Sequence, residues 1–194
     1  MPSVQAEHLV VALKRIAAAL RDAEIEFALG GGLAAWARGG PPTDNDIDLL
    51  IREEDARRAI EVASRAGLRV EVPPEGWLVK AWDGEVLIDL IHHPTGLPVD
   101  DALMARCDEL VVRAVAMRVV RVDDLLTSKL LALGEHNLDL SPTLRIARAL
   151  REQIDWDVLW QRTSCSPYAR TFFTLVRELR VLSTASVVRP VEVA

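Results

Sequence analysis

The feature that most constrains this chain is a glycine-rich turn followed closely by two alternating carboxylates. Segment 28–35 reads Ala-Leu-Gly-Gly-Gly-Leu-Ala-Ala, and segment 46–51 reads Asp-Ile-Asp-Leu-Leu-Ile. Alternation along a strand places Asp46 and Asp48 on one face. Neighbouring carboxylates repel each other unless a cation lies between them, and Mg²⁺ binds such oxygen pairs together with substrate phosphates. Glycine N–H groups at a helix start suit a phosphate. The two segments together predict a site for a metal-bound nucleotide.

A third carboxylate lies in a later apolar strand. Asp89 is the only polar residue in segment 86–91, which reads Val-Leu-Ile-Asp-Leu-Ile. Burying a carboxylate without a partner is costly, so a bound cation or a basic side chain is the simplest reason for its presence there. We therefore interpret Asp89 as a functional residue.

The apolar periodicity divides the chain into an α/β half, residues 1–120, and a helical half, residues 121–194. Residues 5–24 have the spacing of an amphipathic helix, and Asp83-Gly84 is typical of a hairpin turn. Strands are predicted at 26–29, 46–51, 68–72, 77–82, 86–91 and 110–122, and further helices at 33–38, 53–66, 123–133, 155–162 and from the Ser-Pro pairs at 141 and 166.

Composition bounds the class of protein. The 194 residues carry a net charge of −6, which gives no global attraction to nucleic acid. No apolar run is long enough to span a membrane, and the N-terminus lacks the pattern of a signal peptide, so we expect a cytoplasmic protein without a membrane partner.

Basic residues are concentrated in the helical half. Segment 141–180 holds seven arginines and four acidic residues, a net charge of +3. The arginines form two stripes at helical spacing, Arg145, Arg148 and Arg151, and Arg170, Arg177 and Arg180. Such stripes are either solvated faces or a surface for an RNA backbone.

The glycines and carboxylates together resemble the signature of the nucleotidyltransferase superfamily, to which DNA polymerase beta belongs. That signature has a glycine pair, a spacer, an Asp-hydrophobic-Asp motif and a later acidic strand residue; here Gly31-Gly32 precede Asp46 by a thirteen-residue spacer. Segments 27–51, 86–92 and 122–139 resemble the small bacterial AbiEii/MenT-type nucleotidyltransferase toxins. The resemblance implies a mixed twisted sheet with flanking helices (class α/β, or α+β), followed by a C-terminal helical bundle.

The resemblance also implies roles for the three carboxylates and the glycines. Asp46 and Asp48 would bind two Mg²⁺ ions, and Asp89 would share one ion and help to deprotonate an acceptor hydroxyl. Gly31 and Gly32 would hold the triphosphate of a nucleoside triphosphate.

Two residues of the helical half complete the implied site. Lys129, in the apolar segment 122–133, matches the family lysine that contacts the phosphates of the nucleotide; a lysine that extends from the surface is the competing interpretation. Asp139 matches a later acidic residue of the nucleotide site.

Three functions follow from these observations. The first is transfer of a nucleoside monophosphate (NMP) to the 3′ end of tRNA, in a toxin with a cognate antitoxin. The second is nucleotidylation of a small hydroxylated antibiotic such as an aminoglycoside or a lincosamide. The third is a non-catalytic nucleotide-binding or partner-binding module, which the presence of all three carboxylates disfavours.

The tryptophans are interpreted as packing residues. Trp77 and Trp82 flank one strand of the predicted hairpin, and Trp156 and Trp160 lie at helical spacing.

Overall fold

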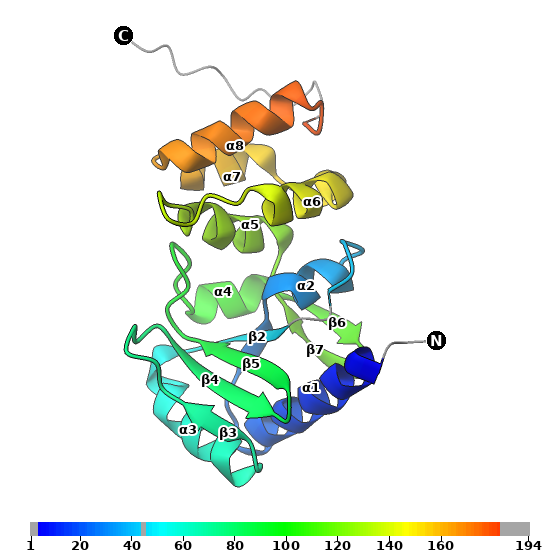
Figure 1. Cartoon of the computed structure of the whole chain (residues 1–194), viewed down its shortest axis with the longest axis vertical. Helices are drawn as coiled ribbons and strands as arrows, with labels where there is room; N and C mark the ends of the chain where they lie inside the picture. The colour runs from blue at the N-terminus through cyan, green and yellow to red at the C-terminus, as the bar shows by residue number, and fades with distance from the viewer. Residues whose placement is uncertain (1–3, 44–45, 183–194) are drawn as a thin grey trace.

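The computed structural model describes residues 4–43 and 46–182 (Figure 1). Over these residues, seven strands form one mixed sheet in the order β3-β4-β5-β2-β1-β7-β6. The strands are β1 (Phe27–Leu29), β2 (Asp46–Ile51), β3 (Arg69–Glu71), β4 (Leu78–Asp83), β5 (Val86–Ile91), β6 (Asp108–Val112) and β7 (Val115–Val119). The α-helices are α1 (Val4–Asp22), α2 (Gly31–Ala37), α3 (Ala56–Arg65), α4 (Asp101–Arg106), α5 (Val122–Leu131), α6 (Ser141–Ala149), α7 (Trp156–Thr163) and α8 (Pro167–Glu178). The mixed sheet with flanking helices confirms the predicted fold class.

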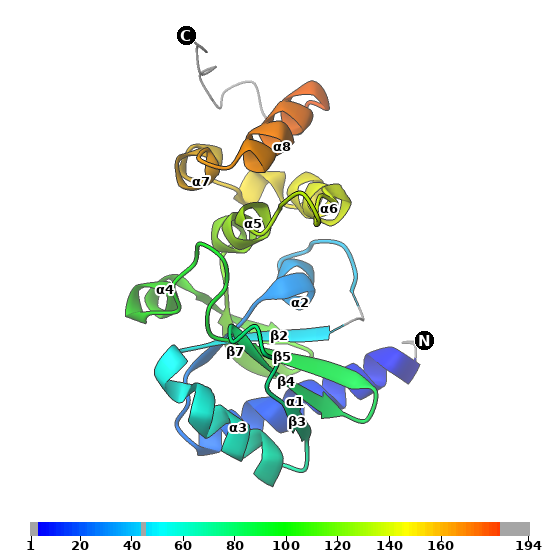
Figure 2. The ribbon, with the colours of Figure 1, turned by 60° about the vertical axis from the view of Figure 1, so that its left-hand side comes forward.

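Helices α1 and α3 cover one face of the sheet (Figure 2). The predicted apolar stripe of α1 is buried there, since Leu13, Ile16 and Leu20 have no exposed surface. It packs against the strand residues that point away from the carboxylates, among them Ile47 and Ile88. The alternation of β2 therefore puts its apolar side chains in the core and its two carboxylates on the opposite face.

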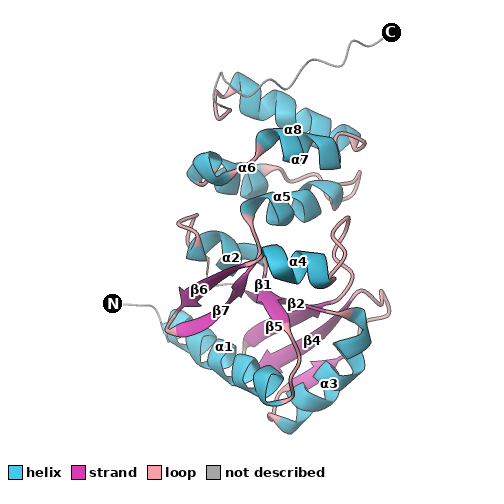
Figure 3. Ribbon diagram, turned by 180° about the vertical axis from the view of Figure 1, so that it is seen from behind, coloured by secondary structure: helices cyan, strands magenta, loops and turns pink. Residues whose placement is uncertain are grey.

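The second face of the sheet carries α2 and α4, and the helices α5 to α8 stack beyond them (Figure 3). Helix α2 packs on β2 and also contacts α5, which in turn contacts α6, α7 and α8. Trp156 and Trp160 both meet Phe173 edge to face, with ring centroids 6.3 and 5.0 Å away, so their predicted packing role is confirmed. The helical layer thus reaches the sheet through the contact between α5 and α2.

The hairpin of β4 and β5 has the register that its turn predicts. Gly84 has a φ of +62°, and Asp83 pairs with Val86. Antiparallel pairing then sets Lys80 directly opposite Asp89. Strand β5 also runs parallel to β2, where Asp89 pairs with Asp48. These two registers bring the second and third carboxylates together.

The prediction of one strand over 110–122 is wrong, because the segment contains the hairpin of β6 and β7. Its two turn residues, Arg113 and Ala114, have φ angles of +50° and +65°. Such turns ordinarily use Asn or Gly, so the sequence shows no turn signal. The guanidinium of Arg113 lies over the ring of Trp36, 4.3 Å from its centroid, and this contact ties the turn to α2.

The pattern did not predict two short helices of the structure, α4 and a 3₁₀ helix at Arg151–Gln153. Helix α4 is capped by Asp100, whose carboxylate accepts a hydrogen bond from the N–H of Leu103 at 2.8 Å. The proposed boundary between residues 120 and 121 stays a prediction, although α5 begins at Val122. None of the helices within the described ranges is long and apolar enough to cross a membrane.

Candidate active site

Three carboxylates converge on the face of the sheet that bears α2. Asp46 and Asp48 lie two residues apart on β2, and Asp89 lies beside Asp48 on the parallel strand β5. One oxygen from each of the three lies within 4.8 Å of the others. Sequence alternation predicted the pairing of the first two, and the strand register brings in the third. Oxygen ligands at this separation suit a divalent cation.

The electrostatics of this cluster favour a cation. Burial, followed by the charge of Asp46, raises the pKa of Asp48 to about 7, while the charge of Lys129 opposes the shift. Burial also raises the pKa of Asp89, against the effect of Lys80, whose Nζ lies 3.3 Å from an Asp89 oxygen. A bound cation would relieve both the repulsion and the cost of burial. The residues present therefore fit a metal ion.

The glycine turn brings the backbone directly against Asp48. Gly31 begins α2 with a φ of +57°, and a Cβ built on it would lie 1.6 Å from Oδ2 of Asp48. A Cβ on Gly32 would lie 2.9 Å from Oγ1 of Thr43, and the interaction of the Gly32 backbone with Asp48 lowers the pKa of that carboxyl. The glycine pair is thus required by the close approach of chain and carboxylate, as well as by the left-handed conformation at Gly31.

A cleft of about 630 Å³ opens beside the carboxylates, a size within the usual range for a small-molecule site. Its walls come from both halves of the chain: Gly32, Ala35, Pro41, Pro42, Thr43, Asp46, Asp48, Lys129, Pro142, Arg145 and Ile146. A smaller cavity of about 120 Å³ adjoins it and shares Asp48 and Lys129. The predicted site residues Gly32, Asp46, Asp48 and Lys129 therefore share one cleft.

The structure separates the two predicted residues of the helical half. Lys129 lines the cleft, and its charge lowers the pKa of Asp48. Asp139 is exposed, and its carboxylate accepts the N–H of Ser141 at 2.9 Å at the start of α6. This hydrogen bond, followed by the Ser141 side chain, lowers the pKa of Asp139. A nucleotide contact of Asp139 remains a prediction, whereas its contact with α6 is observed.

Thr43, Arg145 and Lys80 lie at the site without having been predicted there. The first two line the cleft, and the third pairs with Asp89. The hairpin turn at Asp83-Gly84 held the signal for Lys80, because counting back from that turn sets it opposite Asp89. The other two depend on the loop before β2 and on the docking of α6, which local periodicity does not reveal.

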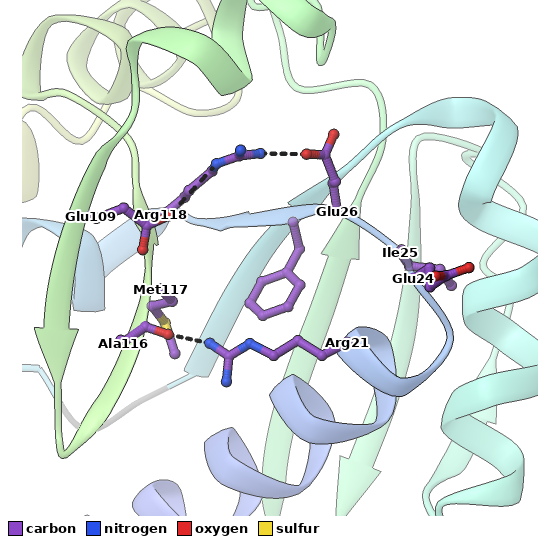
Figure 4. A pocket seen from close by; sticks show the side chains of 9 residues that line it. Arg21, Glu24, Ile25, Glu26, Glu109, Ala116, Met117 and Arg118 are labelled. Atoms are coloured by element: carbon purple, nitrogen blue, oxygen red, sulfur yellow. Dashed lines mark hydrogen bonds and ion pairs between the residues drawn. The ribbon is translucent and has the colours of Figure 1, made fainter.

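A second hollow, of about 570 Å³, lies at the other end of β1, where that strand diverges from β7 (Figure 4). Arg21 reaches across it to the carbonyl of Ala116, over the ring of Phe27, and Arg118 binds Glu26 at 2.7 Å. The hollow holds none of the three carboxylates. Its cations are engaged with protein groups, so we assign the chemistry to the cleft.

The raised pKa of Asp48 predicts that metal binding depends on pH. Below pH 7 the carboxyl of the metal-free protein holds a proton that a cation must displace, so divalent-metal affinity is expected to fall about tenfold per pH unit. The same proton affects folding stability. Between pH 3.8 and about pH 7 the folded state binds this proton and the unfolded state does not, so the free energy of unfolding of the metal-free protein declines as the pH rises through that window. Mn²⁺ titration calorimetry at pH 6 and pH 8 measures the first effect, and equal affinities at both values would contradict it.

The substitution Gly31→Ala is expected to abolish metal and nucleotide binding while leaving the sheet intact. The new methyl group would collide with Asp48 and force its carboxylate out of the cluster. Gly39→Ala is the matched control, because Gly39 also has a positive φ, +91°, and a Cβ added to it would meet nothing within 4 Å. Both variants incur backbone strain. If only Gly31→Ala loses binding, the loss is therefore due to the collision with Asp48 and not to the strain. Nucleotide binding measured by fluorescence anisotropy decides this.

The amino-acid sequence matches a family model described as "Nucleotidyl transferase of unknown function (DUF2204)" over residues 10–167. No curated protein matches the sequence.

Several solved structures are similar to this chain. The crystal structure of ANT(2″)-Ia in complex with adenylyl-2″-tobramycin covers 84% of this chain and 98% of its own, at 17% identity and a TM-score of 0.65. The lincosamide antibiotic adenylyltransferase LnuA, bound to lincomycin, covers 73% and 96%, at 13% identity and a TM-score of 0.52. An antigenic nucleotidyltransferase-like protein from Paracoccidioides brasiliensis covers 93% of this chain and 92% of its own, at 15% identity and a TM-score of 0.52. At these identities the likeness shows the fold.

Proposed function

The chain belongs to the DUF2204 family of nucleotidyl transferases, and from this premise we propose that it transfers NMP from a nucleoside triphosphate to an acceptor hydroxyl in a Mg²⁺-dependent reaction. The observation that carries the proposal is the convergence of Asp46, Asp48 and Asp89 within 4.8 Å beside a cleft of nucleotide size. Gly30 and Gly31 of the glycine turn and Lys129 line the smaller cavity that adjoins this cleft.

The residues divide the work between binding and proton transfer. Asp46 and Asp48 would hold two Mg²⁺ ions, with Asp89 sharing one; the ions would neutralise charge that develops on the phosphate oxygens. Asp89 accepts the proton of the acceptor hydroxyl. The hydroxyl oxygen bonds to the α-phosphorus, the bond to the bridging oxygen of the β-phosphate breaks, and pyrophosphate leaves.

The remaining groups of the cleft orient the triphosphate. Gly31 and Gly32 would leave room for the phosphates at the glycine turn, because neither residue has a side chain. Lys129, from α5, adds a positive charge to the cleft. Asp139 is also a proposed nucleotide residue, as the resemblance implies.

We propose the 3′ end of tRNA as the acceptor. In its support, helix α6 carries Arg145 at the cleft and the exposed Arg148, two cations for the RNA backbone beyond the 3′ end. A basic wall suits a polyanion. A toxin role, held in check by a cognate antitoxin, belongs to the same proposal.

A small hydroxylated antibiotic is the second candidate. The fold is shared with nearly the full length of ANT(2″)-Ia, whose structure holds adenylyl-2″-tobramycin, and with LnuA, whose structure holds lincomycin. The non-catalytic alternative has no such support, because the three carboxylates are present and converge.

Labelled nucleotides distinguish these candidates. The protein is incubated with Mg²⁺ and each α-labelled nucleoside triphosphate, together with total tRNA, tobramycin or lincomycin. We expect labelled tRNA, and growth arrest on expression of the wild type but not of an Asp48→Asn variant. If folded protein labels one of the drugs and does not label tRNA, the second candidate, nucleotidylation of a small antibiotic, is the function.

A further inference from the structure

The sheet has a second row of side chains next to the carboxylates, and it lies outside the main core. Register places Asp46, Leu87, Trp82 and Arg69 side by side across β2, β5, β4 and β3. Leu87 and Trp82 are half-buried, and neither belongs to the apolar cluster that fills the core. Four neighbouring strands make the row roughly 14 Å long. Leu87 and Trp82 thus form an apolar strip between the carboxylate Asp46 and Arg69 on the edge strand β3.

Apart from Asp46, which also lines the nucleotide cleft, this row extends from the triad away from that cleft. The cleft walls come from α2, β2, α5 and α6, whereas the row follows β5, β4 and β3. Helices α1 and α3 pack on these strands from the other face of the sheet (Figure 2). Asp89, the proposed proton acceptor, stands in the adjoining row. An acceptor lying along Leu87 and Trp82 would therefore reach the triad from the side away from the triphosphate.

The chemistry of the row is that of a stacking surface with positive charge. The Arg69 guanidinium lies over the Trp82 ring, 3.8 Å from the centroid, while its side chain stays 65% exposed. Lys80 stands in the adjoining row, opposite Asp89. Beyond the catalytic carboxylates, the charged groups of these two rows are Arg69, Lys80 and Glu71, of which two are cations. Single-stranded RNA is bound by stacking bases on aromatic rings and guanidinium planes and by cations near its phosphates.

We propose that Trp82, Arg69 and Leu87 form the docking surface for the 3′-terminal nucleotides of a single-stranded RNA acceptor. This inference rests on the proposed NMP transfer and names the acceptor side of that same site. A terminal base stacks on the Arg69–Trp82 pair, Leu87 contacts the sugar, and the 3′-hydroxyl is directed towards Asp89. A polycationic aminoglycoside has no aromatic plane to stack and would meet Arg69 and Lys80 as like charges.

Variants matched by residue type test the stacking directly. Binding of a short 5′-labelled single-stranded RNA is measured by fluorescence anisotropy, without catalysis. Trp82→Ala is expected to weaken binding about tenfold, the usual scale of one lost stack, with Trp82→Phe recovering most of it. Trp77→Ala is the control, because Trp77 is 42% exposed and precedes β4 at its other end. Arg69→Lys keeps the positive charge but loses the planar guanidinium, so it should weaken RNA binding. Arg65→Lys, at an exposed position on α3, is the matched control and should leave RNA binding unchanged.

Transfer kinetics separate this inference from the proposed function. Trp82→Ala should raise the KM for RNA about tenfold and leave the KM for the nucleoside triphosphate unchanged. If the wild type labels RNA but Trp82→Ala keeps its RNA affinity and KM, the docking surface is wrong and the transferase stands. Tobramycin binding that depends on Trp82 while RNA binding does not would also overturn it. If the wild type transfers to no acceptor, the proposed function fails, and the anisotropy series still decides the RNA surface.

Discussion

The Asp48→Asn variant is expected to lose NMP transfer by at least about a thousandfold. Asp48 is the carboxylate nearest the glycine turn and shares the cluster with Asp46 and Asp89. Loss of a residue that hydrogen-bonds a metal ligand typically costs about 10–100-fold in metal affinity or activity, so neutralising Asp48, a proposed direct ligand, should cost about 10³-fold or more in activity. The same change should stabilise the metal-free protein at pH 8, where the wild-type charge is held against burial and repulsion. Single-turnover rates and metal-free thermal melts measure the two effects.

Asp83→Asn is the matched control for that variant. Asp83 ends β4 and pairs with Arg15 at 2.7 Å, away from the cluster. It should retain transfer within a factor of about two, because surface ion pairs contribute little. Unchanged transfer by Asp48→Asn would remove the carboxylate cluster from the chemistry.

The Asp124→Asn substitution is expected to lower the free energy of unfolding by about 3 kcal/mol, the lower end of the cost of breaking a buried ion pair. The Asp124 side chain is 1% exposed; it accepts two hydrogen bonds from Arg106, at 2.8 and 3.0 Å, and one from Arg162 at 2.9 Å. These contacts join α4, α5 and α7. Because both arginines are partly exposed, they regain water when the charge is removed, which keeps the loss near the lower limit.

Denaturant unfolding of the metal-free protein measures this loss. Glu152→Gln is the control, because Glu152 pairs with Arg151 at an 82% exposed position and should change stability by less than about 0.5 kcal/mol. Equal stabilities of the two variants would contradict the structural role of Asp124. Helix α5 also carries Lys129, so Asp124→Asn should lose activity at the temperature where it melts.

Local rules anticipated the carboxylate cluster because each step is short in sequence. Alternation fixed Asp46 and Asp48 on one face. The register from the Asp83-Gly84 turn also sets Lys80 opposite Asp89, although Lys80 was not predicted at the site. The parallel pairing of β2 with β5 needed the whole sheet, yet the family resemblance had already joined their carboxylates.

Other features depend on contacts that a single segment does not reveal. The turn at Arg113 has positive φ without glycine or asparagine, and its contact with Trp36 comes from a distant helix. Trp82 was interpreted as a packing residue, whereas it lies outside the core beneath Arg69. The cleft itself forms only when α6 docks beside α2, so Arg145 could not be placed from periodicity.

The most direct test of NMP transfer follows each phosphate of the substrate separately. The protein, Mg²⁺ and tRNA are incubated with nucleoside triphosphate labelled at either the α- or the γ-phosphate. We expect that the α-label enters tRNA, that the γ-label is released as pyrophosphate, and that Asp48→Asn does neither. Transfer of the γ-label to any acceptor, or transfer that persists in Asp48→Asn, would contradict NMP transfer at this cluster.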